Sequence, residues 1–549
     1  MYFIIPNFYI TPELTDSLGV TRLDYASGYE YQTLAADSSL IPSSGNLYNY
    51  APVNHFMRPD ERWSIGGMVD YAISDTTTVY GELMFNSDAT RGQIAESGTF
   101  FAEEYLLPVD NAYFPQTFQD SLAALFPVDP EICNAAHNNK AGDPLGYDAA
   151  TETGNAFLNP GVGLGCQAVE NVGMYIGKRN VEGGQRVSVI NHDALRAVIG
   201  LEGEINDSWT YNVSYQYSQT TSSNVYLNDF FAPKIKTAVN SALCEADSSC
   251  IPYQVFTYQG VTPEMASNLT GVAAMSGTVS QSVTGGYVTG VLPDSMALAN
   301  DAPIVVFGFE IRDDKYERIA DTVYSEGQLL GQGGATPSVA GSIEVKELYF
   351  EASIPVMQDE DAGDLTVDLG YRYSDYQTNK REDLFTADTY KVGIEYQPIE
   401  QLKVRAGFNH AVRAPNIFNL FTPNTFGLWA GEDKCAGDTP AYTEAQCANT
   451  GVAAGQYGTI AASPADQYNL KGGGNENLGA EAADTITFGV VVNPMDDLSF
   501  SIDYWDIEIE DTIRIISVSF FMGANITESA ALIQVSSYPD CAFLLHHWK

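Results

Sequence analysis

Apolar and polar side chains alternate along ten segments of this chain. In the first segment Trp63, Ile65, Val69 and Tyr71 share one face, and polar or small residues lie between them. Successive side chains of a β-strand point to opposite faces of the sheet, so each segment predicts a strand with one apolar face. Short turns join the ten strands into five hairpins, which comprise 62–71 with 79–86, 195–205 with 209–217, 348–354 with 365–373, 390–396 with 402–408, and 486–492 with 498–504.

The two faces of these strands differ in charge. The apolar faces hold no charged residue, whereas the opposite faces hold many, among them Asp70, Glu202 and Arg372. A charge that faces lipid at mid-depth costs about 2–4 kcal/mol. Lipid also offers no hydrogen bonds to a backbone, so only helices or closed sheets can span it. The pattern is therefore typical of strands that turn one face to a membrane. A soluble β-sandwich, which also alternates, is the alternative.

The connections between the hairpins have unequal lengths. Segments 87–190, 219–343 and 410–484 are long, and only 376–388 is brief. Long loops at one end and short turns at the other are typical of outer-membrane barrels. A strand of ten residues that rises about 3.3 Å per residue and is tilted by about 45° spans about 23 Å of the membrane. The outward apolar band of such barrels is about 25 Å tall. The prediction is an all-β fold, a transmembrane antiparallel β-barrel with long extracellular loops and one loop helix over 231–244.

The chain is strongly acidic. Its 549 residues carry 26 Lys and Arg against 70 Asp and Glu, a net charge of −44. Such a chain repels phosphate backbones, so no nucleic-acid partner is expected. A charged fraction of 17% with 45% apolar residues does not fit disorder. No stretch is apolar enough for a transmembrane helix, and residues 1–6 lack the pattern of a signal peptide.

Six of the seven cysteines fall in three local pairs within polar, glycine-rich regions. This predicts loop disulfides in an oxidising compartment, and free thiols of a cytosolic protein are the alternative. Cys541 has no obvious partner. No CxxC or zinc-finger spacing occurs, so neither a metal site nor a cofactor is predicted. The predicted pairs are Cys133 with Cys166, Cys244 with Cys250, and Cys435 with Cys447.

Several motifs resemble barrel segments of the TonB-dependent outer-membrane receptors. Gly472–Leu478 followed by Ile486–Gly489, and then Ile502–Ile509, are similar to late barrel stretches of that family, and Val345–Pro355 to an earlier one. The resemblance covers about 45–510. Its most specific part is a signature that consists of Ala411, Val412, Arg413, Ala414, Pro415 and Asn416.

This resemblance implies a barrel of the 22-strand type filled by an N-terminal plug. It also implies energy from the inner-membrane TonB complex, which pulls on a TonB box ahead of the plug. No plug precedes the first hairpin here, and the last residues do not alternate, so we expect an incomplete barrel that lacks the plug and the last strands. The expected domains are an early barrel strand or loop segment over 1–44, the receptor barrel over 45–510, and a loop, helix or aberrant C-terminus over 511–549.

No GxSxG, HExxH or P-loop motif occurs, so we do not expect an enzyme. Inward charges could contact a plug, which we prefer, or steer substrate. Arg413 and Asn416 are interpreted as fixing the transition from strand to loop, and Arg413 could instead line the lumen. Loop aromatics suit sugars or aromatic chelates, or simply pack the loops. The candidates are Arg372, Lys391, Glu395, Lys403, Arg405, Asn409, His410 and Arg413 in the lumen, and Tyr105, Tyr113, Phe114, Tyr226, Phe230 and Phe231 in the loops.

The leading hypothesis is a TonB-dependent transporter in the bacterial outer membrane for a nutrient too large for porins, such as an oligosaccharide, a ferric siderophore or a cobalamin-like ligand. Its expected partners are the lipid bilayer and lipopolysaccharide, the TonB complex and the small-molecule nutrient. A plugless passive channel or surface adhesin is the second hypothesis. A secreted soluble β-rich protein that binds glycans is the third.

Overall fold

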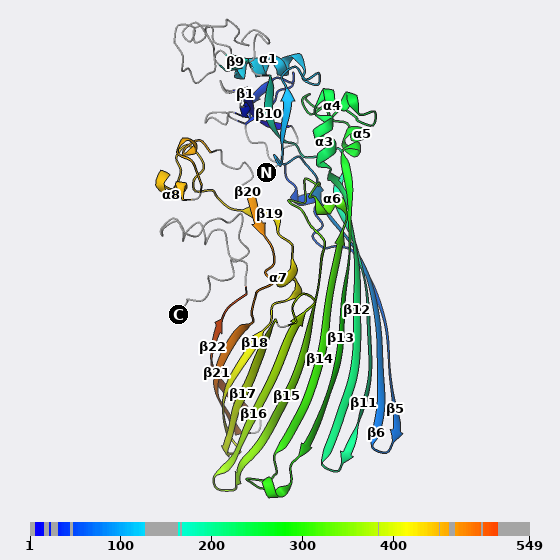
Figure 1. Ribbon diagram of the computed structural model, residues 1–549, viewed down its shortest axis with the longest axis vertical. Helices are drawn as coiled ribbons and strands as arrows, with labels where there is room; N and C mark the ends of the chain where they lie inside the picture. Colours follow the sequence, from blue (N-terminus) through cyan, green and yellow to red (C-terminus); the bar gives the residue numbers. More distant parts are fainter. Residues whose placement is uncertain are drawn as a thin grey trace.

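A single antiparallel sheet of twelve strands dominates the structure, and its order along the sheet follows the chain. The computed structural model describes residues 6–15, 21–23, 31–43, 48–126, 163–164, 167–168, 170–382, 384–449, 451–460, 467–495 and 498–513. The twelve strands, from one edge to the other, are β5 (Asp60–Ser74), β6 (Thr77–Glu96), β11 (Gln185–Asn206), β12 (Trp209–Phe230), β13 (Thr270–Val291), β14 (Ile304–Ala320), β15 (Val339–Asp359), β16 (Gly363–Thr378), β17 (Phe385–Ile399), β18 (Leu402–Arg413), β21 (Glu481–Met495) and β22 (Leu498–Glu510) (Figure 1).

All five predicted hairpins are present, and a sixth was not predicted. The predicted hairpins are β5–β6, β11–β12, β15–β16, β17–β18 and β21–β22. The expectation of one long connection over 219–343 is wrong, because β13 and β14 lie within it. Ser, Thr, Gly or Ala hold most of the outward positions of β13, so its sequence alternates only weakly between apolar and polar.

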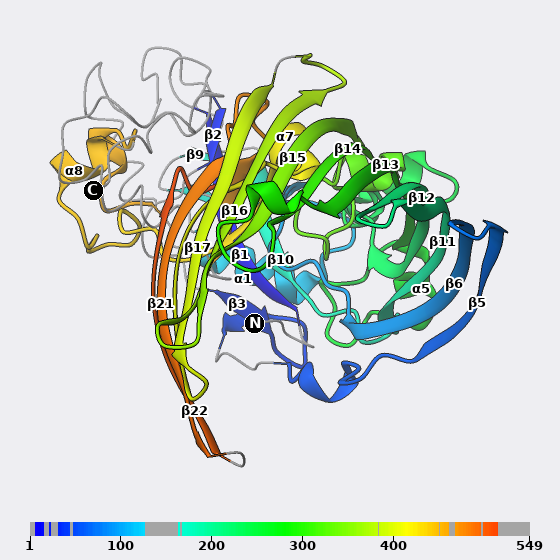
Figure 2. The same cartoon turned by 90° about the horizontal axis from the view of Figure 1, so that it is seen from below.

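The sheet is curved and open. Figure 2 shows it from below, bent around an interior. Within the described residues β5 pairs only with β6 and β22 only with β21, so these two strands are the edges and the barrel is not closed. The short turns lie at the lower end of the sheet and the long connections at the upper end (Figure 1). This is the asymmetry of an outer-membrane barrel, and the open sheet agrees with the expectation of an incomplete one.

The apolar positions form the outer face of the sheet and the charged positions the inner face. Leu348 on the outer face is 64% exposed, whereas its neighbour Glu347 on the inner face is 7% exposed. Cross-strand aromatic pairs such as Phe307 and Phe350 pack on the outer face, with ring centroids 4.9 Å apart. Toward the upper end the outward positions change from apolar to charged side chains, most of them carboxylates, among them Asp313, Lys346, Asp375, Asp388, Asp484 and Asp506.

A second sheet lies at the upper end of the structure. Its strands come from the segment before β5 and from the long connection between β6 and β11. It consists of β4 (Leu40–Pro42), β3 (Gln32–Leu34), β1 (Asn7–Thr15), β10 (Asn171–Gly177) and β7 (Glu104–Pro108), with β2 (Thr21–Leu23) beside β1. We use the name loop unit for this sheet together with α1 (Gln116–Leu125), α3 (Ala232–Ala238), α4 (Ser241–Ala246) and α5 (Pro263–Asn268). Its core is continuous and includes Phe8, Phe118 and Phe256. The described part of 1–44 therefore contributes strands to the loop unit and none to the twelve-stranded sheet.

The helix predicted over 231–244 is present as two pieces, α3 and α4. Asn240 separates them, because its side chain accepts hydrogen bonds from the backbone N–H groups of Ala242 and Leu243 and so caps α4. Among the helices of the described residues, none has the length and apolar character to cross a membrane. The remaining short elements are η1 (Ala51–Val53), β8 (Gly163–Leu164), β9 (Gln167–Ala168), η3 (Asp294–Met296), α6 (Thr322–Ser325), α7 (Ile417–Phe421), β19 (Thr425–Ala430), α8 (Glu444–Ala448), η4 (Ala454–Gln456) and β20 (Gln467–Gly472).

Candidate functional site

All of the predicted lumen residues except His410 lie on the inner face of β16, β17 and β18, and most of them form ion pairs between strands. The Arg372 guanidinium lies 2.8 Å from a Glu347 carboxylate oxygen, and Lys391 Nζ lies 2.7 Å from one of Glu351. Arg405 lies 2.8 Å from Asp503. Lys403 pairs with Glu395, and Arg413 pairs with Glu481. The inner wall therefore carries a ladder of mutually neutralised charges.

The last residues of β18 turn to different faces. Asn409 lies on the inner face, where the backbone register places it opposite Lys391. His410 occupies the outward phase of Val404, Ala406 and Phe408, so its predicted place in the lumen is wrong. Its ring stacks on Tyr390 with centroids 5.0 Å apart, and its Nδ1 lies 2.6 Å from Asp484. It stands among the outward carboxylates at the upper end of the sheet.

An open depression of about 440 Å³ interrupts the inner wall near the β22 edge. Asp368, Glu395, Arg405, Asp503 and Trp505 contribute to its lining. The lining also includes Ile394, Phe488 and Tyr504, so charged and apolar groups both contribute to it, and Trp505 is 66% exposed. The depression therefore combines hydrogen-bonding groups with the exposed ring of Trp505.

The signature 411–416 carries the chain from β18 into α7. Arg413 pairs with Glu481 on β21, and its guanidinium also donates to the carbonyl of Ile513 at 3.3 Å. Asn416 caps α7 in a reciprocal pair of hydrogen bonds. Its side chain accepts from the backbone N–H of Asn419, and the Asn419 side chain accepts from the backbone N–H of Asn416. Ile417, Leu420 and Phe421 of α7 then pack with inner-face residues of β15, β16 and β17, namely Val339, Ile343, Val345, Tyr376 and Ala387. The geometry agrees with the structural interpretation of Arg413 and Asn416.

The predicted loop aromatics are largely buried. Tyr105, Phe114 and Phe230 are at most 4% exposed and belong to the core of the loop unit. Tyr113 packs against the same core. Tyr226 is 5% exposed in a neighbouring cluster with Tyr324 and Leu329, against which Phe231 packs. Of the two alternatives for these aromatics, loop packing is therefore the one that the structure favours.

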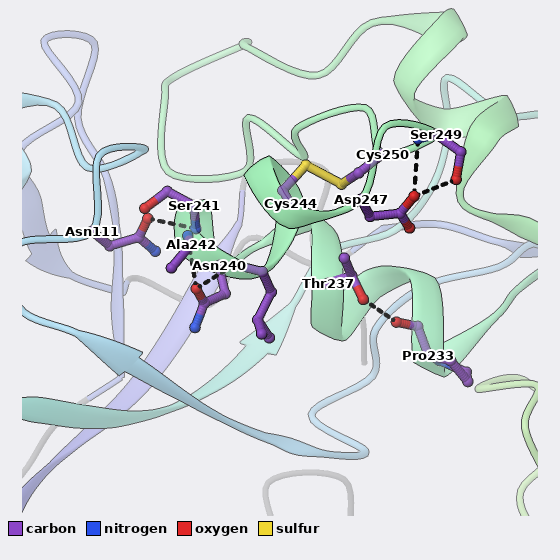
Figure 3. Close-up of a disulfide and its surroundings, with 11 residues drawn as sticks. Asn111, Pro233, Thr237, Asn240, Ser241, Ala242, Cys244, Asp247, Ser249 and Cys250 are labelled. Carbon is purple, nitrogen blue, oxygen red and sulfur yellow. Dashed lines mark hydrogen bonds between the residues drawn. A yellow bond between two sulfur atoms is a disulfide. The ribbon is translucent and has the colours of Figure 1, made fainter.

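A disulfide stabilises one loop of the loop unit, and a buried amide joins that loop to another (Figure 3). Cys244 and Cys250 form the disulfide that staples the end of α4 to the following turn. The side chain of Asn111, from the loop that follows β7, donates to the carbonyl of Val239 at 2.8 Å and accepts from the backbone of Ser241 at 3.2 Å. The Asn111 side chain thus links two segments that are about 130 residues apart in the sequence.

The disulfide Cys435–Cys447 is also present, so two of the three predicted pairs are confirmed. Cys133, Cys166 and Cys541 lie outside the described residues, as does the segment after residue 513. Within the part that the structure describes, no group of three or more His, Cys, Asp or Glu side chains is arranged to hold a metal ion.

The sequence did not reveal a buried polar junction between the loop unit and the sheet. Ser97 hydrogen-bonds the carboxylate of Asp229, both fully buried, and Asp229 also accepts from the backbone of Gly331 at 3.1 Å. Arg186 donates to the carbonyls of Ala95 at 2.9 Å and Gly331 at 3.2 Å. These residues come from β6, β11, β12 and two loops, so no local motif could have indicated them.

Comparisons with known proteins agree with this geometry. A family model described as "TonB dependent receptor-like, beta-barrel" matches residues 134–526, well over half of the chain. No curated protein matches the chain. Among solved structures, the ferric enterobactin receptor PfeA from Pseudomonas aeruginosa is 12% identical, covering 92% of this chain and 54% of its own, with a TM-score of 0.41.

Two further solved structures are similar at the same level. The siderophore receptor PirA from Acinetobacter baumannii is 13% identical over 93% of this chain and 54% of its own, with a TM-score of 0.40. The RagAB peptide transporter is 11% identical over 85% and 42%, also with a TM-score of 0.40. The chain spans about half the length of these receptors. With the family model matched over most of its length, the chain belongs to the TonB-dependent receptors and supplies part of their β-barrel.

Proposed function

We propose that this chain forms part of the wall of an outer-membrane transporter that takes up a nutrient too large for porins. In this proposal the inner-membrane TonB complex supplies the energy through a plug and a TonB box, which the family uses for this purpose. The location is the outer membrane of a Gram-negative bacterium. Family membership supports the proposal, and the nutrient, the TonB complex and lipopolysaccharide are its proposed partners.

One observation carries this proposal, namely the division of charge between the two faces of the twelve-stranded sheet. The outward positions of the band between the lower turns and the upper carboxylates are uncharged, as Leu365, Val367 and Leu369 of β16 illustrate. The inward positions of the same strand hold Asp364, Asp368 and Arg372. Because lipid penalises charge and an aqueous lumen does not, a membrane selects this division and a soluble sandwich with a dry core does not.

Membrane fractionation combined with heat-modifiable migration on gels tests the location. We expect the chain to sediment with outer membranes, to resist extraction by carbonate or urea, and to migrate faster before boiling than after it. A chain found in the periplasm or the medium, with the same migration before and after heating, would contradict the proposal.

Uptake tests the transport role in the producing bacterium. Deletion of the gene is expected to abolish growth on a limiting nutrient, and deletion of tonB is expected to reproduce that loss. Growth that depends on this gene but not on tonB would favour a passive channel instead.

A further inference from the structure

One inward-facing row of residues runs in register across six neighbouring strands, from β11 to β16. Backbone pairing places Glu202 opposite Asn212, Asn212 opposite Tyr287, Tyr287 opposite Gly308, Gly308 opposite Tyr349, and Tyr349 opposite Arg372. We use the name inner belt for these six residues. The outward neighbours of Tyr349 are Leu348 and Phe350, so the inner belt lies at the depth of the apolar outer band.

The aromatic rings of the inner belt lie along the wall. A Cβ atom on Gly308 would lie 2.1 Å from Cζ of Tyr349, so the missing side chain makes room for the ring. The Arg372 guanidinium lies 4.7 Å from the centroid of the same ring. Tyr287 is the more exposed of the two tyrosines in the row, with 42% of its surface exposed. The row therefore places two aromatic rings on the inner wall, one of them covered by its neighbours and the other exposed.

Hydrogen-bonding groups flank these rings. The amide of Asn212 donates to Glu202 at 3.3 Å and accepts from the Tyr80 hydroxyl at 3.1 Å. On the other side Arg372 is paired with Glu347. An aromatic face bordered by carboxylate, amide and guanidinium groups can stack against the apolar face of a sugar ring and hydrogen-bond its hydroxyl groups.

The charge of the inner wall decides between the classes of nutrient. The basic side chains Arg196, Arg312, Arg372, Lys391, Lys403 and Arg405 form ion pairs with carboxylates, whereas Arg318 donates to the carbonyl of Pro337. In the described part of the wall, Asp70, Glu202, Glu204 and Asp368 have no basic partner within 4.0 Å. This described part of the wall therefore has an excess of negative charge, which repels a polyanion such as a ferric tris-catecholate and leaves a neutral ligand unaffected.

We propose that the inner belt binds successive rings of an uncharged oligosaccharide on its way through the lumen. Tyr287 provides the main stacking face. Glu202 accepts hydrogen bonds from the sugar hydroxyl groups, and the amide of Asn212 accepts from or donates to them. Arg372 holds the Tyr349 ring in place. This inference rests on the proposed function, since it names the substrate class of the same lumen.

Binding to the full chain in lipid nanodiscs tests the inference. The probes are neutral hexasaccharides of glucose, xylose and mannose, with a ferric tris-catecholate as the anionic comparison, and the readout is saturation-transfer NMR with titration. We expect at least one hexasaccharide to bind and the catecholate complex not to bind. Tyr287→Ala should weaken sugar binding about tenfold, the typical value of one stacked ring, and Tyr287→Phe should retain most of it. The matched control Tyr371→Ala, on the outer face, should change nothing.

Three results would overturn the inference: no hexasaccharide binds, the catecholate binds in their place, or Tyr287→Ala leaves sugar binding intact. Heat-modifiable migration of the same samples separates this inference from the proposed function. A chain that inserts into the membrane without binding sugar contradicts the inner belt alone. A chain that binds sugar without inserting contradicts the membrane location alone.

Discussion

The ring of Tyr349 lies across Gly308 on the neighbouring strand, so closely that a Cβ atom at residue 308 would lie 2.1 Å from the ring. Glycine weakens a strand by itself, but a large cross-strand neighbour can cover the exposed backbone. The same arrangement recurs at Gly200, where a Cβ would lie 2.2 Å from Cζ of Tyr80. Glycine and tyrosine thus shape the inner wall as cross-strand pairs.

Substitution of Gly308 should disturb this wall. Gly308→Ala forces the Tyr349 ring away from the sheet, and we expect a loss of about 1–3 kcal/mol in the free energy of unfolding. Urea titration in lipid vesicles, followed by tryptophan fluorescence, measures the change. Gly67→Ala is the control, because a Cβ there meets nothing within 4 Å. Equal stability of the two variants would contradict the close contact.

A charge introduced at two adjacent residues of β16 should cost very different amounts of stability. Val367 points outward and Thr366 inward at the same depth of the sheet. Val367→Arg places a cation in lipid and should cost about 2–4 kcal/mol, whereas Thr366→Arg faces the lumen opposite Glu395 and should cost less than about 1 kcal/mol. Insertion yield and urea midpoints in vesicles report the difference. Equal losses would argue that both faces are buried in protein.

Removal of the Asn111 side chain should uncouple the two loops that it joins. Asn111→Ala deletes the bonds to Val239 and Ser241 and leaves buried groups unpaired, which typically costs about 1–3 kcal/mol each. We expect faster cleavage of 231–269 by protease under native conditions. Gln116→Ala, which removes only an exposed bond to Asp120, is the control and should leave the cleavage rate unchanged.

Alkaline pH should destabilise the loop unit. Burial raises the pKa of Tyr105 and of Tyr253 above the ordinary value of 10.0, and both hydroxyl groups lack hydrogen-bond partners. The unfolded chain therefore loses these protons first, so their contribution to stability is complete below pH 10 and is lost as the pH rises further. Near-ultraviolet circular dichroism follows the transition.

The double variant with Tyr105→Phe and Tyr253→Phe should shift this alkaline transition to higher pH. At neutral pH it should match or exceed the native chain in stability, because two unpaired buried hydroxyl groups are gone. An unchanged alkaline midpoint would show that other groups control it.

The membrane-facing hairpins could be predicted from the sequence because each carries its own signal. Strands such as β16 alternate large apolar and polar residues, and lipid on one side and water on the other enforce that alternation locally. The hairpin β13–β14 was missed although β14 alternates Val305, Phe307, Phe309 and Ile311. Its partner β13 does not alternate, because small residues there are covered by larger ones on adjacent strands, as Phe309 covers Gly286.

The loop unit and the fine structure of the lumen could not be predicted, since both depend on contacts between distant residues. Phe8 packs against Phe118 and Phe256, which no local pattern connects. Arg372 and Lys391 were predicted to lie on the inner face, but their partners Glu347 and Glu351 follow only from the register between strands. For His410, the strand period alone already indicated the outer face, and the change from apolar to charged outward positions obscured it.

The central claim is that lipid covers the apolar face of the twelve-stranded sheet. Spin labels placed singly at residues 365–373 of β16, in the chain reconstituted into vesicles, test it by their collision rates with oxygen and with a water-soluble nickel chelate. We predict a two-residue alternation, in which labels at 365, 367, 369 and 371 favour oxygen and labels at 366, 368, 370 and 372 favour nickel. Labels at the odd positions that meet neither reagent would mean that a protein layer covers this face, and the account would be contradicted.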